Sequence, residues 1–568
     1  MSMGNSNTVR ITAVMASLFI TTLFLVLYRR HLPSNSNFKI HHNNERMLLQ
    51  PSQLFPAVNE ACSATQLPDL CKSSLSQVPA NAGPQDIIRA AMDLSSEGAK
   101  RGRVLSKDLL AVSSENENIT AAAKNCVEFM DYSTELVAKS RTAPLEGRIK
   151  DVKAWMSAAL AYAYDCASDL RYVNTSQKVS AVIRHMDSVT NFTSNALNMV
   201  DALDTYGNNM ALWRPPKTER QSSNPTSISQ HRIADYSTNF EGKHDRIFGT
   251  AMLPNMTVSK EKGAVSSIQA AVNSAPDYSA QKFVIRIRAG VYEEIVRVPR
   301  SKTNLVFVGE GMERTVIRGS RYVPSLPGAV TVYDSAVVGV NGDGFVARDL
   351  TIENTYSGPM THQAVALRVD SDLSAFYNCA FLSHQDTLYT HTLRQFYQNC
   401  TIEGTHDFIF GNAAAVLEGS TIRVRPRQLK SKHGEKDPLT AQGRTDPAQS
   451  TGLVFRGCSV DGTEEYIKDF KANPSVHMVF LGRPWKMYSR TVFMTSYLGQ
   501  LIRPEGWMPW NGSFALDTLF YGEFRNYGPG AKINGRVPWC NQISDKSVGM
   551  YSVESFIQGN QWIPATQA

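Results

Sequence analysis

The chain lacks most of the short motifs that mark metal, redox or nucleic-acid sites. None of its eight cysteines falls in a C-x-x-C pair, which argues against a zinc site or a redox site. No zinc finger, coiled-coil seam or basic-aromatic platform is present, so nucleic acid is a poor candidate partner. The absence of G-x-S-x-G leaves a serine-esterase mechanism without support. A net charge of +7 over 568 residues fits attraction to an anionic polymer or surface without requiring one.

One long apolar run lies close to the N-terminus. It extends from Ile11 to Tyr28, carries no charge and is bounded by Arg10 and Arg29. The run is short for a membrane-spanning helix and long for a signal-peptide core. Residues 1–30 are therefore expected to be a signal anchor or a cleaved signal, and either one directs the chain into the secretory pathway. Anchoring of the precursor in a membrane stays open.

Sequons and cysteines agree with secretion. The six N-x-[ST] sequons lie at Asn118, Asn174, Asn191, Asn255, Asn399 and Asn511. The even number of cysteines is compatible with disulfides in an oxidising compartment.

Residues 53–205 are predicted to form an all-α up-and-down helical bundle. Apolar residues recur there at three- and four-residue spacing, with many Ala and Leu. No cluster in this region looks catalytic. Its cysteines are Cys62, Cys71, Cys126 and Cys166. Their spacing in an Ala-rich helical region resembles the invertase and pectin methylesterase inhibitor family. The resemblance implies that the first cysteine pairs with the second and the third with the fourth.

Two further segments follow the predicted bundle. Residues 206–246 are polar, rich in Pro and Ser, and without a period, which indicates a linker and a possible processing region. Residues 247–568 consist of short β-branched runs separated by Gly, Asn and Asp, which indicates strands.

The second region repeats itself. "FYNCAFLSHQDTLY" (376–389) aligns with "FYQNCTIEGTHDFIF" (396–410) once one residue is inserted. The aligned pairs, each 21 apart, are Cys379 and Cys400, Asp386 and Asp407, and Tyr389 and Phe410. Gln363 and Gln385 lie 22 apart. A period near twenty with strand-like units predicts a parallel β-solenoid.

Stacked coils would place equivalent residues about 4.8 Å apart. Asp386 and Asp407 could not both ionise easily there, so one pKa should rise while the other stays low, which separates an acid from a nucleophile or base. Tyr389 and Phe410 would stack beside them as an aromatic wall. The alternative is that these Asp residues only cap turns. The coincidence of two Asp, two aromatic and two Gln residues favours chemistry.

Several motifs resemble those of plant-type pectin methylesterases, in the same order. They are "GVYEE" (290–294), "HQAVAL" (362–367), "HQDTLY" (384–389), "DFIFGNA" (407–413), "AQGRTDP" (441–447), "LGRPW" (481–485) and "QWIPAT" (561–566). The similarity covers residues 255–566. It implies an all-β right-handed parallel β-helix for residues 247–568, preceded by the all-α bundle as a prodomain, with no metal or other cofactor.

The resemblance also assigns roles in the hydrolysis of the C6 methyl ester of galacturonate. Asp407 would be the nucleophile, and Asp386 the general acid and then the base. Gln363 and Gln385 would donate hydrogen bonds to the oxyanion, and Arg483 would pair with Asp407. The residues expected to line the sugar subsites are Tyr389, Phe410, Trp485 and Trp507. The substrate would be methylesterified homogalacturonan, met in the cell wall after secretion.

Local details of the predicted site depart from a regular strand or from the family pattern. Neighbours on a strand face opposite sides, so Gln385 followed by Asp386 implies a local turn. His384 and His406 replace an aromatic and an aliphatic residue. They are either tolerated neighbours or, as imidazolium ions, would lower the pKa values of the two aspartates.

Four cysteines of the second region have less certain partners. Stacking makes Cys379 and Cys400 candidates for a disulfide, with free buried thiols as the alternative. Cys540 is a candidate partner for Cys458. No Arg-Arg-Leu-Leu type processing sequence precedes the second region, so removal of the prodomain stays open.

The rival enzymes are other β-helix pectin enzymes, because glycoside hydrolysis also uses two carboxylates. Residues 247–568 lack the Gly-His-Gly and Arg-Ile-Lys signatures of polygalacturonases and the acidic calcium cluster expected of a lyase, and the one Arg-Ile-Lys of the chain, at 148–150, lies in the helical region. A non-catalytic pectin-binding regulator is the other alternative, and the presence of all five catalytic residue types argues against it.

Overall fold

The computed structural model describes residues 56–219, 253–324, 330–357, 362–427 and 435–563. The expected signal or anchor, residues 1–30, lies outside these residues. Among the helices that are described, none is long and apolar enough to cross a membrane.

Four long helices form the predicted up-and-down bundle. They are α4 (Pro84–Ala111), α5 (Glu117–Thr142), α6 (Leu145–Tyr172) and α7 (Gln177–Tyr206). Two short helices, α2 (Pro56–Cys62) and α3 (Pro68–Ser74), precede them, and a 3-10 turn, η2 (Met210–Leu212), follows. Asn116 and Ser176 cap α5 and α7 by accepting hydrogen bonds from backbone N–H groups of the first turn. Short connections between the long helices make sequential neighbours antiparallel.

Helix α6 is the most deeply buried of the bundle. Between Val152 and Leu170 most of its side chains are buried on more than one face, as expected for a helix with partners on several sides. Its regular part begins only after Arg148, because Glu146, Gly147 and Arg148 are not helical and Gly147 has a φ of 83°.

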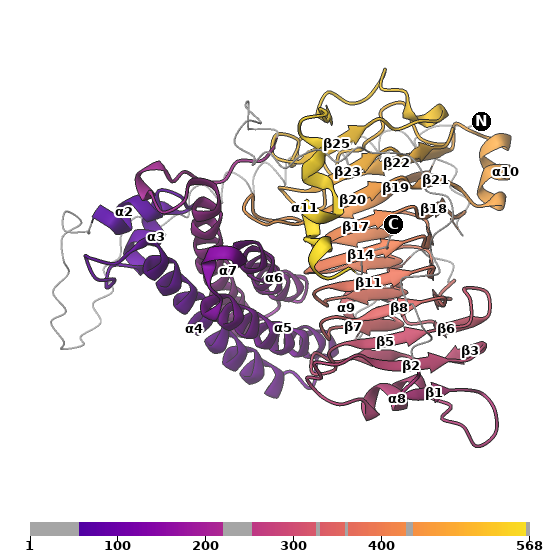
Figure 1. The fold of residues 1–568 in the computed structure, drawn as a ribbon, viewed down its shortest axis with the longest axis horizontal. Coiled ribbons are helices and arrows are strands. Elements are labelled where there is room, and N and C mark those ends of the chain that lie inside the picture. The colour runs from indigo at the N-terminus through magenta and orange to yellow at the C-terminus, as the bar shows by residue number, and fades with distance from the viewer. Residues whose placement is uncertain (1–55, 220–252, 325–329, 358–361, 428–434, 564–568) are drawn as a thin grey trace, which may run out of the picture. The chain divides into compact units, whose positions relative to one another are not determined.

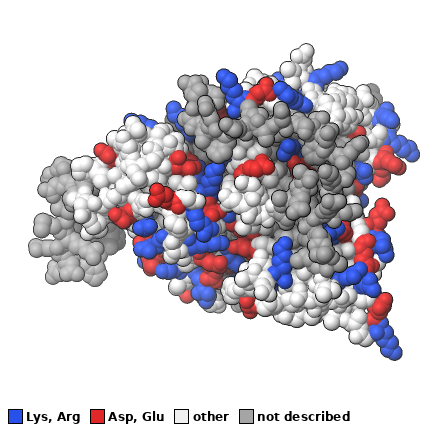
Figure 2. Space-filling view, in the orientation of Figure 1, with Lys and Arg blue, Asp and Glu red and all other residues white. Residues whose placement is uncertain are grey.

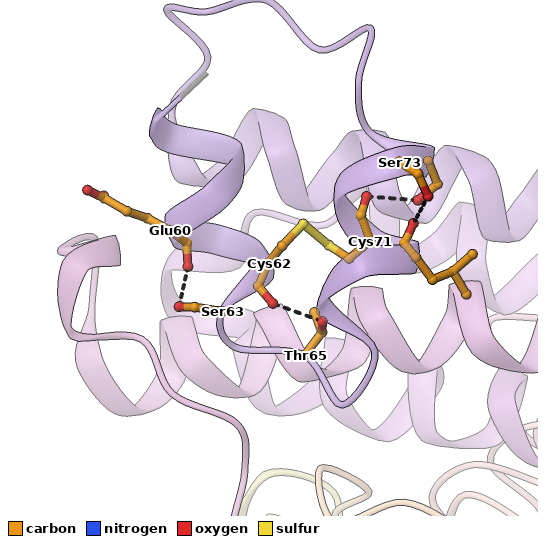
Figure 3. The surroundings of a disulfide bond; sticks show 8 residues. Glu60, Cys62, Ser63, Thr65, Cys71 and Ser73 are labelled. Atoms are coloured by element: carbon orange, nitrogen blue, oxygen red, sulfur yellow. Dashed lines mark hydrogen bonds between the residues drawn. A yellow bond between two sulfur atoms is a disulfide. The ribbon is translucent and has the colours of Figure 1, made fainter. Parts of the chain in front are cut away.

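Two disulfides join the four cysteines of the bundle as the resemblance implies. Cys62 bonds to Cys71, which holds α2 against α3 (Figure 3). Cys126 of α5 bonds to Cys166 of α6. Both predicted pairings are confirmed.

In the described residues, the second region winds into three parallel sheets, so the predicted parallel β-helix is confirmed. The first sheet contains β1 (Met256–Val258), β2 (Phe283–Ile287), β5 (Leu305–Val308), β8 (Val346–Arg348), β11 (Ser374–Tyr377), β14 (Arg394–Gln398), β17 (Ala414–Glu418), β20 (Gly452–Arg456), β23 (Arg490–Met494), β25 (Phe520–Phe524) and β26 (Cys540–Gln542). The second contains β3 (Gly290–Glu293), β6 (Thr315–Gly319), β9 (Thr351–Asn354), β12 (Ala380–Leu382), β15 (Thr401–Gly404), β18 (Thr421–Val424), β21 (Ser459–Gly462) and β24 (Tyr497–Leu498). The third contains β4 (Val296–Val298), β7 (Val338–Val340), β10 (Leu367–Val369), β13 (Leu388–Thr390), β16 (Ile409–Gly411), β19 (Glu435–Gln442) and β22 (His477–Gly482).

Each coil from the one that begins with β2 to the one that begins with β20 contributes one strand to each sheet, and Figure 1 shows the first sheet as a ladder from β2 to β25. The register of this sheet gives the length of each coil. Ala375 pairs with Phe396, and Phe396 pairs with Val416, so these two coils are short. Val416 pairs with Val454, and Val454 with Val492, so each of the next two coils is nearly twice as long. The repeat seen in the sequence thus covers the two shortest of these coils.

A ladder of left-handed residues forms one corner of the solenoid. The residue directly after seven strands of the first sheet has φ between 47° and 58°. These residues are Asp349, Asn378, Asn399, Gly419, Gly457, Thr495 and Arg525. Because Asn, Asp and Gly adopt this conformation at least cost, they mark the corner in five of the seven coils. The sharp turn aims the next strand into the second sheet.

Stacked side chains fill the interior of the solenoid. Phe376 stacks on Tyr397 with ring centroids 4.9 Å apart, and Phe455 stacks on Phe493 at 4.3 Å. Such ladders follow from in-register parallel pairing, which repeats the same position in every coil.

The predicted disulfide between Cys379 and Cys400 is wrong, since both thiols are free and buried. Their Sγ atoms lie against backbone carbonyls, that of Cys379 at 3.3 Å from Tyr377 O and that of Cys400 at 3.5 Å from Phe376 O. In-register neighbours point their side chains in the same direction about 4.8 Å apart, whereas a disulfide needs Cβ atoms that converge to about 3.8 Å. The suggested pairing of Cys458 with Cys540 is also wrong, because both are free.

The bundle and the solenoid belong to one compact unit, residues 54–568. Trp155 of α6 donates a hydrogen bond to Asp372 Oδ2 at 2.9 Å. Asn198 of α7 donates one to Asp446 Oδ1 at 3.1 Å, and Gln449 donates one back to the carbonyl of Ser157 at 2.9 Å. Polar contacts between side chains of both regions therefore hold them together.

The segment expected to be a linker begins as packed chain. Trp213 is fully buried in the bundle core, and its Nε1 donates to the carbonyl of Gly207 at 2.9 Å. Thr218 is also fully buried. The described residues up to Glu219 are thus anchored at Trp213 and Thr218, although most of them are exposed, and the linker interpretation stays a prediction.

On the described part of the face shown in Figure 2, Lys and Arg are interspersed with Asp and Glu. Of the sequon residues, Asn174, Asn255 and Asn511 are exposed. Asn118, Asn191 and Asn399 are half-buried. Glycosylation at all six stays a prediction.

We expect the two disulfides to stabilise the bundle unequally. Cys126–Cys166 closes a loop of 40 residues and Cys62–Cys71 one of nine. Loss of the longer link should cost about 4 kcal/mol in the free energy of unfolding and loss of the shorter about 2.5 kcal/mol, because the longer loop restrains the unfolded chain more. Denaturant unfolding of the Cys126→Ser/Cys166→Ser and Cys62→Ser/Cys71→Ser variants measures both costs. Equal losses would contradict the expectation, and Cys379→Ser is the control without a disulfide.

Candidate active site

The two predicted catalytic aspartates lie at equivalent turns of adjacent coils. Asp386 lies between β12 and β13, and Asp407 between β15 and β16. Their φ angles are 65° and 51°, so both residues are left-handed. The local turn predicted at Gln385–Asp386 is confirmed. The strands that follow pair in register, with Tyr389 opposite Phe410, which stacks the aspartates as the repeat predicts.

Burial and mutual repulsion set the protonation of this pair. Asp386 is 8% exposed and Asp407 is 6% exposed. Burial, and then the charge of Asp407, raise the pKa of Asp386 well above its ordinary value. Burial also raises the pKa of Asp407, but the guanidinium of Arg483 opposes that rise. The expectation that one pKa stays low is wrong for this buried site, because both carboxyls are desolvated. The predicted order of the two pKa values holds, with Asp386 as the group that keeps its proton.

The predicted partner of Asp407 is present in bidentate geometry. Arg483, directly after β22, donates Nε to Asp407 Oδ1 at 2.9 Å and Nη2 to Oδ2. A bidentate guanidinium fixes the carboxylate plane as well as its charge. The backbone N–H of Asp407 donates to Pro438 O at 2.7 Å. The carboxylate and the backbone of Asp407 are therefore both fixed.

The two glutamines lie on adjacent coils, as their spacing predicts. Gln363 and Gln385 form a parallel bridge, in which the N–H of Ala364 donates to the carbonyl of Gln385 at 3.1 Å. The amide side chains of Gln363 and Gln385 thus extend from neighbouring backbone positions, next to the turn that holds Asp386. The side chain of Gln385 also hydrogen-bonds Asp386, which opposes the rise of its pKa.

The predicted aromatic wall is present. Tyr389 stacks on Phe410 with centroids 4.2 Å apart and an interplanar angle of 14°. Trp485 meets Phe410 edge-on at 6.1 Å. Tyr389 is 6% exposed and Phe410 is 4% exposed, so little of the wall is open to solvent in the full chain.

The assignment of Trp507 to the sugar subsites is wrong. Its ring is buried in the solenoid core, stacked on Tyr521 at 4.3 Å, and its Nε1 donates to Glu523 at 3.3 Å. The sequence analysis missed Trp510, three residues later. Trp510 is 37% exposed, and the guanidinium of Arg483 lies over its ring at 4.3 Å. The "WMPW" pattern pointed to this loop but not to the correct tryptophan.

The two unusual histidines have lowered pKa values. Burial, with the nearby charge of Arg425, lowers the pKa of His384 to about 4. Burial, with the charges of Arg427 and Arg483, lowers the pKa of His406 to about 3. Burial therefore favours the alternative in which both histidines are neutral neighbours near pH 7, and the pH dependence of activity decides between the two.

Helix α6 contacts the aromatic wall, which the sequence did not predict. His391 lies beside Tyr389, with ring centroids 4.6 Å apart. Its Nε2 is 2.8 Å from Asp165 Oδ2 of α6, and its Nδ1 forms a close ion pair with Asp370. Although burial lowers it, these carboxylates raise the pKa of His391 to about 9. Lys486 lies over the rings of Trp485 and, on the bundle side, Tyr164, at 4.6 and 4.7 Å. The bundle thus reaches the neighbours of the wall through His391 and Lys486.

Replacing Arg483 should shift the pH dependence of ester hydrolysis. Arg483→Gln removes the cation that opposes the rise of the Asp407 pKa, so that pKa should rise further. Activity that needs ionised Asp407 is lost as pH falls through this pKa, so the acid limb should move to higher pH by about one unit or more. The profile of kcat/KM against pH measures the shift. Arg423→Gln, at an exposed arginine paired with Glu403, is the matched control, and an unmoved acid limb in Arg483→Gln contradicts the prediction.

Replacing the histidines should leave the pH dependence unchanged. Both imidazoles lose their charge well below pH 5 in the folded chain, so His384→Gln and His406→Gln remove no cation in the working range. The same kcat/KM profile, measured from pH 5 to 9, should superimpose on that of the unchanged chain. A displaced acid limb in either variant would show that a charged imidazole acts on the aspartates.

Comparisons with known proteins agree with this geometry. The pectinesterase family model matches residues 255–560, and the plant invertase/pectin methylesterase inhibitor model matches residues 56–199. The probable pectinesterase/pectinesterase inhibitor 64 of Arabidopsis thaliana is 48% identical over 518 residues, which cover 89% of this chain and 84% of that protein. Pectinesterase 1 of Citrus sinensis is 37% identical over 527 residues, covering 90% and 87%.

A solved structure supports the fold of the second region. The pectin methylesterase from carrot is 46% identical, with a TM-score of 0.52, and the match covers 56% of this chain and 98% of that one. This likeness confirms the right-handed parallel β-helix. Since the relatives and both family models span the helical and the β-helical regions, the chain belongs to the pectinesterase family and carries an inhibitor-family region ahead of its esterase region.

Proposed function

We propose that this chain removes methyl esters from the C6 carboxyl groups of galacturonate in pectin, releasing methanol, with Asp407 and Asp386 as its catalytic pair. The observation that carries the residue assignment is the bidentate contact of Arg483 with Asp407 beside a second, more basic carboxyl. One carboxylate is thereby oriented for attack while its neighbour holds a proton. The activity itself is that of the family to which the chain belongs.

In the first half of the reaction, an Asp407 oxygen attacks the ester carbonyl carbon. The amide groups of Gln363 and Gln385 donate hydrogen bonds to the oxyanion that forms. The tetrahedral intermediate collapses as Asp386 gives its proton to the departing methoxy oxygen. Methanol leaves, and the galacturonyl group remains as an anhydride on Asp407.

In the second half, the now ionised Asp386 takes a proton from water. The hydroxide equivalent attacks the anhydride carbonyl, and the same glutamines stabilise the second oxyanion. Cleavage of the bond to Asp407 frees the galacturonate carboxyl and restores ionised Asp407 with its Arg483 pair. Asp386 is again protonated, so the cycle closes without another reactant.

The aromatic residues give the site its sugar-binding face. Tyr389, Phe410 and Trp485 present ring surfaces beside the aspartates, and aromatic faces suit the apolar faces of sugar rings. Trp510 adds a half-exposed ring next to Arg483. We propose these four residues as the substrate-contacting aromatics, acting on methylesterified homogalacturonan in the cell wall.

The bundle is proposed to act in cis on this site. Asp165 and Tyr164 of α6 contact the surroundings of the wall through His391 and Lys486. A polysaccharide cannot use rings that are only 4–6% exposed without displacing what covers them. We therefore expect the intact chain to be less active than a chain whose bundle has been released. The proposed domains are residues 53–205 for the bundle and 247–568 for the esterase.

The test is methanol release from methylesterified pectin by the full chain carrying an inserted protease site between residues 225 and 246. We expect little methanol before cleavage and at least tenfold more after cleavage and removal of the bundle. Asp407→Asn should lose activity by a factor of about 10⁴ or more, because the nucleophile is gone. Asp545→Asn, at an exposed aspartate paired with Arg525, is the matched control. A cleaved, folded chain that releases no methanol would contradict the proposed function.

A further inference from the structure

A pair of buried arginines holds the last described residue of the segment after the bundle. Arg490 Nη2 lies 2.7 Å from Glu219 Oε1, and Arg444 Nη1 lies 3.6 Å from Glu219 Oε2. Arg444 is 2% exposed and Arg490 is 8% exposed. Two guanidinium groups thus converge on a single carboxylate.

Backbone carbonyls accept hydrogen bonds from three other donors of the two arginines, while Nε of Arg490 is buried without a partner among the described residues. Arg490 Nη1 donates to Thr451 O at 3.0 Å. Arg444 Nε donates to Asp446 O at 3.2 Å, and its Nη2 donates to Pro447 O. These carbonyls belong to the solenoid, and the donors that face Glu219 are left for an anion. The solenoid therefore supplies both arginines and the carbonyls that orient them, and Asn198 of the bundle contacts the side chain of Asp446.

The electrostatics of the pair favour an anion at this position. Burial and the charge of Arg490 lower the pKa of Arg444 to about 10, so the two cations oppose one another. Although burial raises it, the charges of Arg490 and Arg444 lower the pKa of Glu219. An occupant with one negative charge relieves the repulsion between two desolvated cations.

A further donor lies within electrostatic reach. The hydroxyl of Tyr551 interacts with Glu219, Arg490 and Arg444. The residue is 2% exposed, and within the described ranges its hydroxyl has no hydrogen-bond partner. A buried hydroxyl without a partner is unfavourable, and a ligand larger than the Glu219 carboxylate would give it one.

Arg444 follows directly along the chain from residues that contact the aromatic wall. Ala441 packs with Tyr389 and Phe410 in the aromatic cluster. Gly443 backs onto Trp485, so closely that a Cβ there would lie 2.9 Å from the ring. Arg444 is the next residue. The site is thus one residue beyond the aromatic wall along the same strand end.

We propose that Arg444 and Arg490 form a binding site for the free carboxylate of a demethylated galacturonate unit, and that Glu219 occupies this site in the full-length chain. The inference rests on the proposed function for the identity of the carboxylate, because a pectinesterase produces galacturonate carboxylates beside unreacted esters. Glu219 imitates the product. Its displacement would both free the segment that leads to the bundle and favour pectin that already carries free carboxylates.

The test is the affinity of the full chain for trigalacturonate, a fully demethylated probe, measured by titration calorimetry. Glu219→Gln should raise this affinity about tenfold or more, because the neutral amide holds the paired arginines less strongly than a charged carboxylate does. Lys217→Gln, at an exposed neighbour, is the matched control and should leave the affinity unchanged. Adding Arg490→Gln to Glu219→Gln should cancel the gain in affinity. Adding Arg490→Lys instead should keep part of the gain, because lysine keeps the positive charge but cannot donate two parallel hydrogen bonds to a carboxylate.

An unchanged affinity in Glu219→Gln would overturn the inference, as would a gain that survives Arg490→Gln. Thermal unfolding of each variant shows whether the arginine replacements fold, and the Glu219→Gln comparison decides the question without them. Methanol release from esterified pectin is recorded in parallel. Methanol release without an affinity gain would refute the carboxylate site alone. An affinity gain without methanol release from the cleaved chain would refute the proposed esterase function and leave the carboxylate site in place.

Discussion

In-register hydrogen bonding between parallel coils is the constraint on which the rest of the structure depends. It fixes Tyr389 opposite Phe410, and it places Gln363 beside Gln385 in a parallel bridge. The stacked interior rings follow the same rule. Because the side-chain direction is repeated with the register, a shift of one residue would separate the aspartates and turn the wall inward. The chemistry therefore depends on backbone pairing along whole strands rather than on any one contact.

Desolvation is the second constraint, and it raises the pKa of acidic groups near the groove and lowers the pKa of basic ones. It keeps a proton on Asp386 and removes one from His406, because in each case the uncharged form is favoured. Where a charge survives burial, a partner is present, as with Arg483 at Asp407 and Glu219 at Arg490. Asp165 of the bundle pairs with His391 beside Tyr389 and raises its pKa, so the inhibitor-family region takes part in setting the environment of the site.

The sequence predicted those features that depend on repetition and failed where side-chain direction decides. Asp386, Asp407 and the aromatic pair were found because the repeat interval can be read directly from the amino-acid sequence. The same interval misled for Cys379 and Cys400, since stacked side chains run parallel and do not converge. Trp507 and Trp510 are alike in type and loop, and only packing shows that the first fills the core. The charge state of the histidines and the position of Glu219 depend on burial by distant segments, which no local pattern contains.

The unequal coil lengths have a consequence for how such a molecule can change. The aspartates occupy the two short coils, which leave little chain beyond the strands and corners. The coils after them are nearly twice as long and supply Arg483, Trp485 and Arg444 from their extra segments. Insertions and deletions in those segments alter the walls of the groove while the reacting centre keeps its spacing. Substrate preference can thus diversify among relatives at the long coils, with the reaction itself held constant by the short ones.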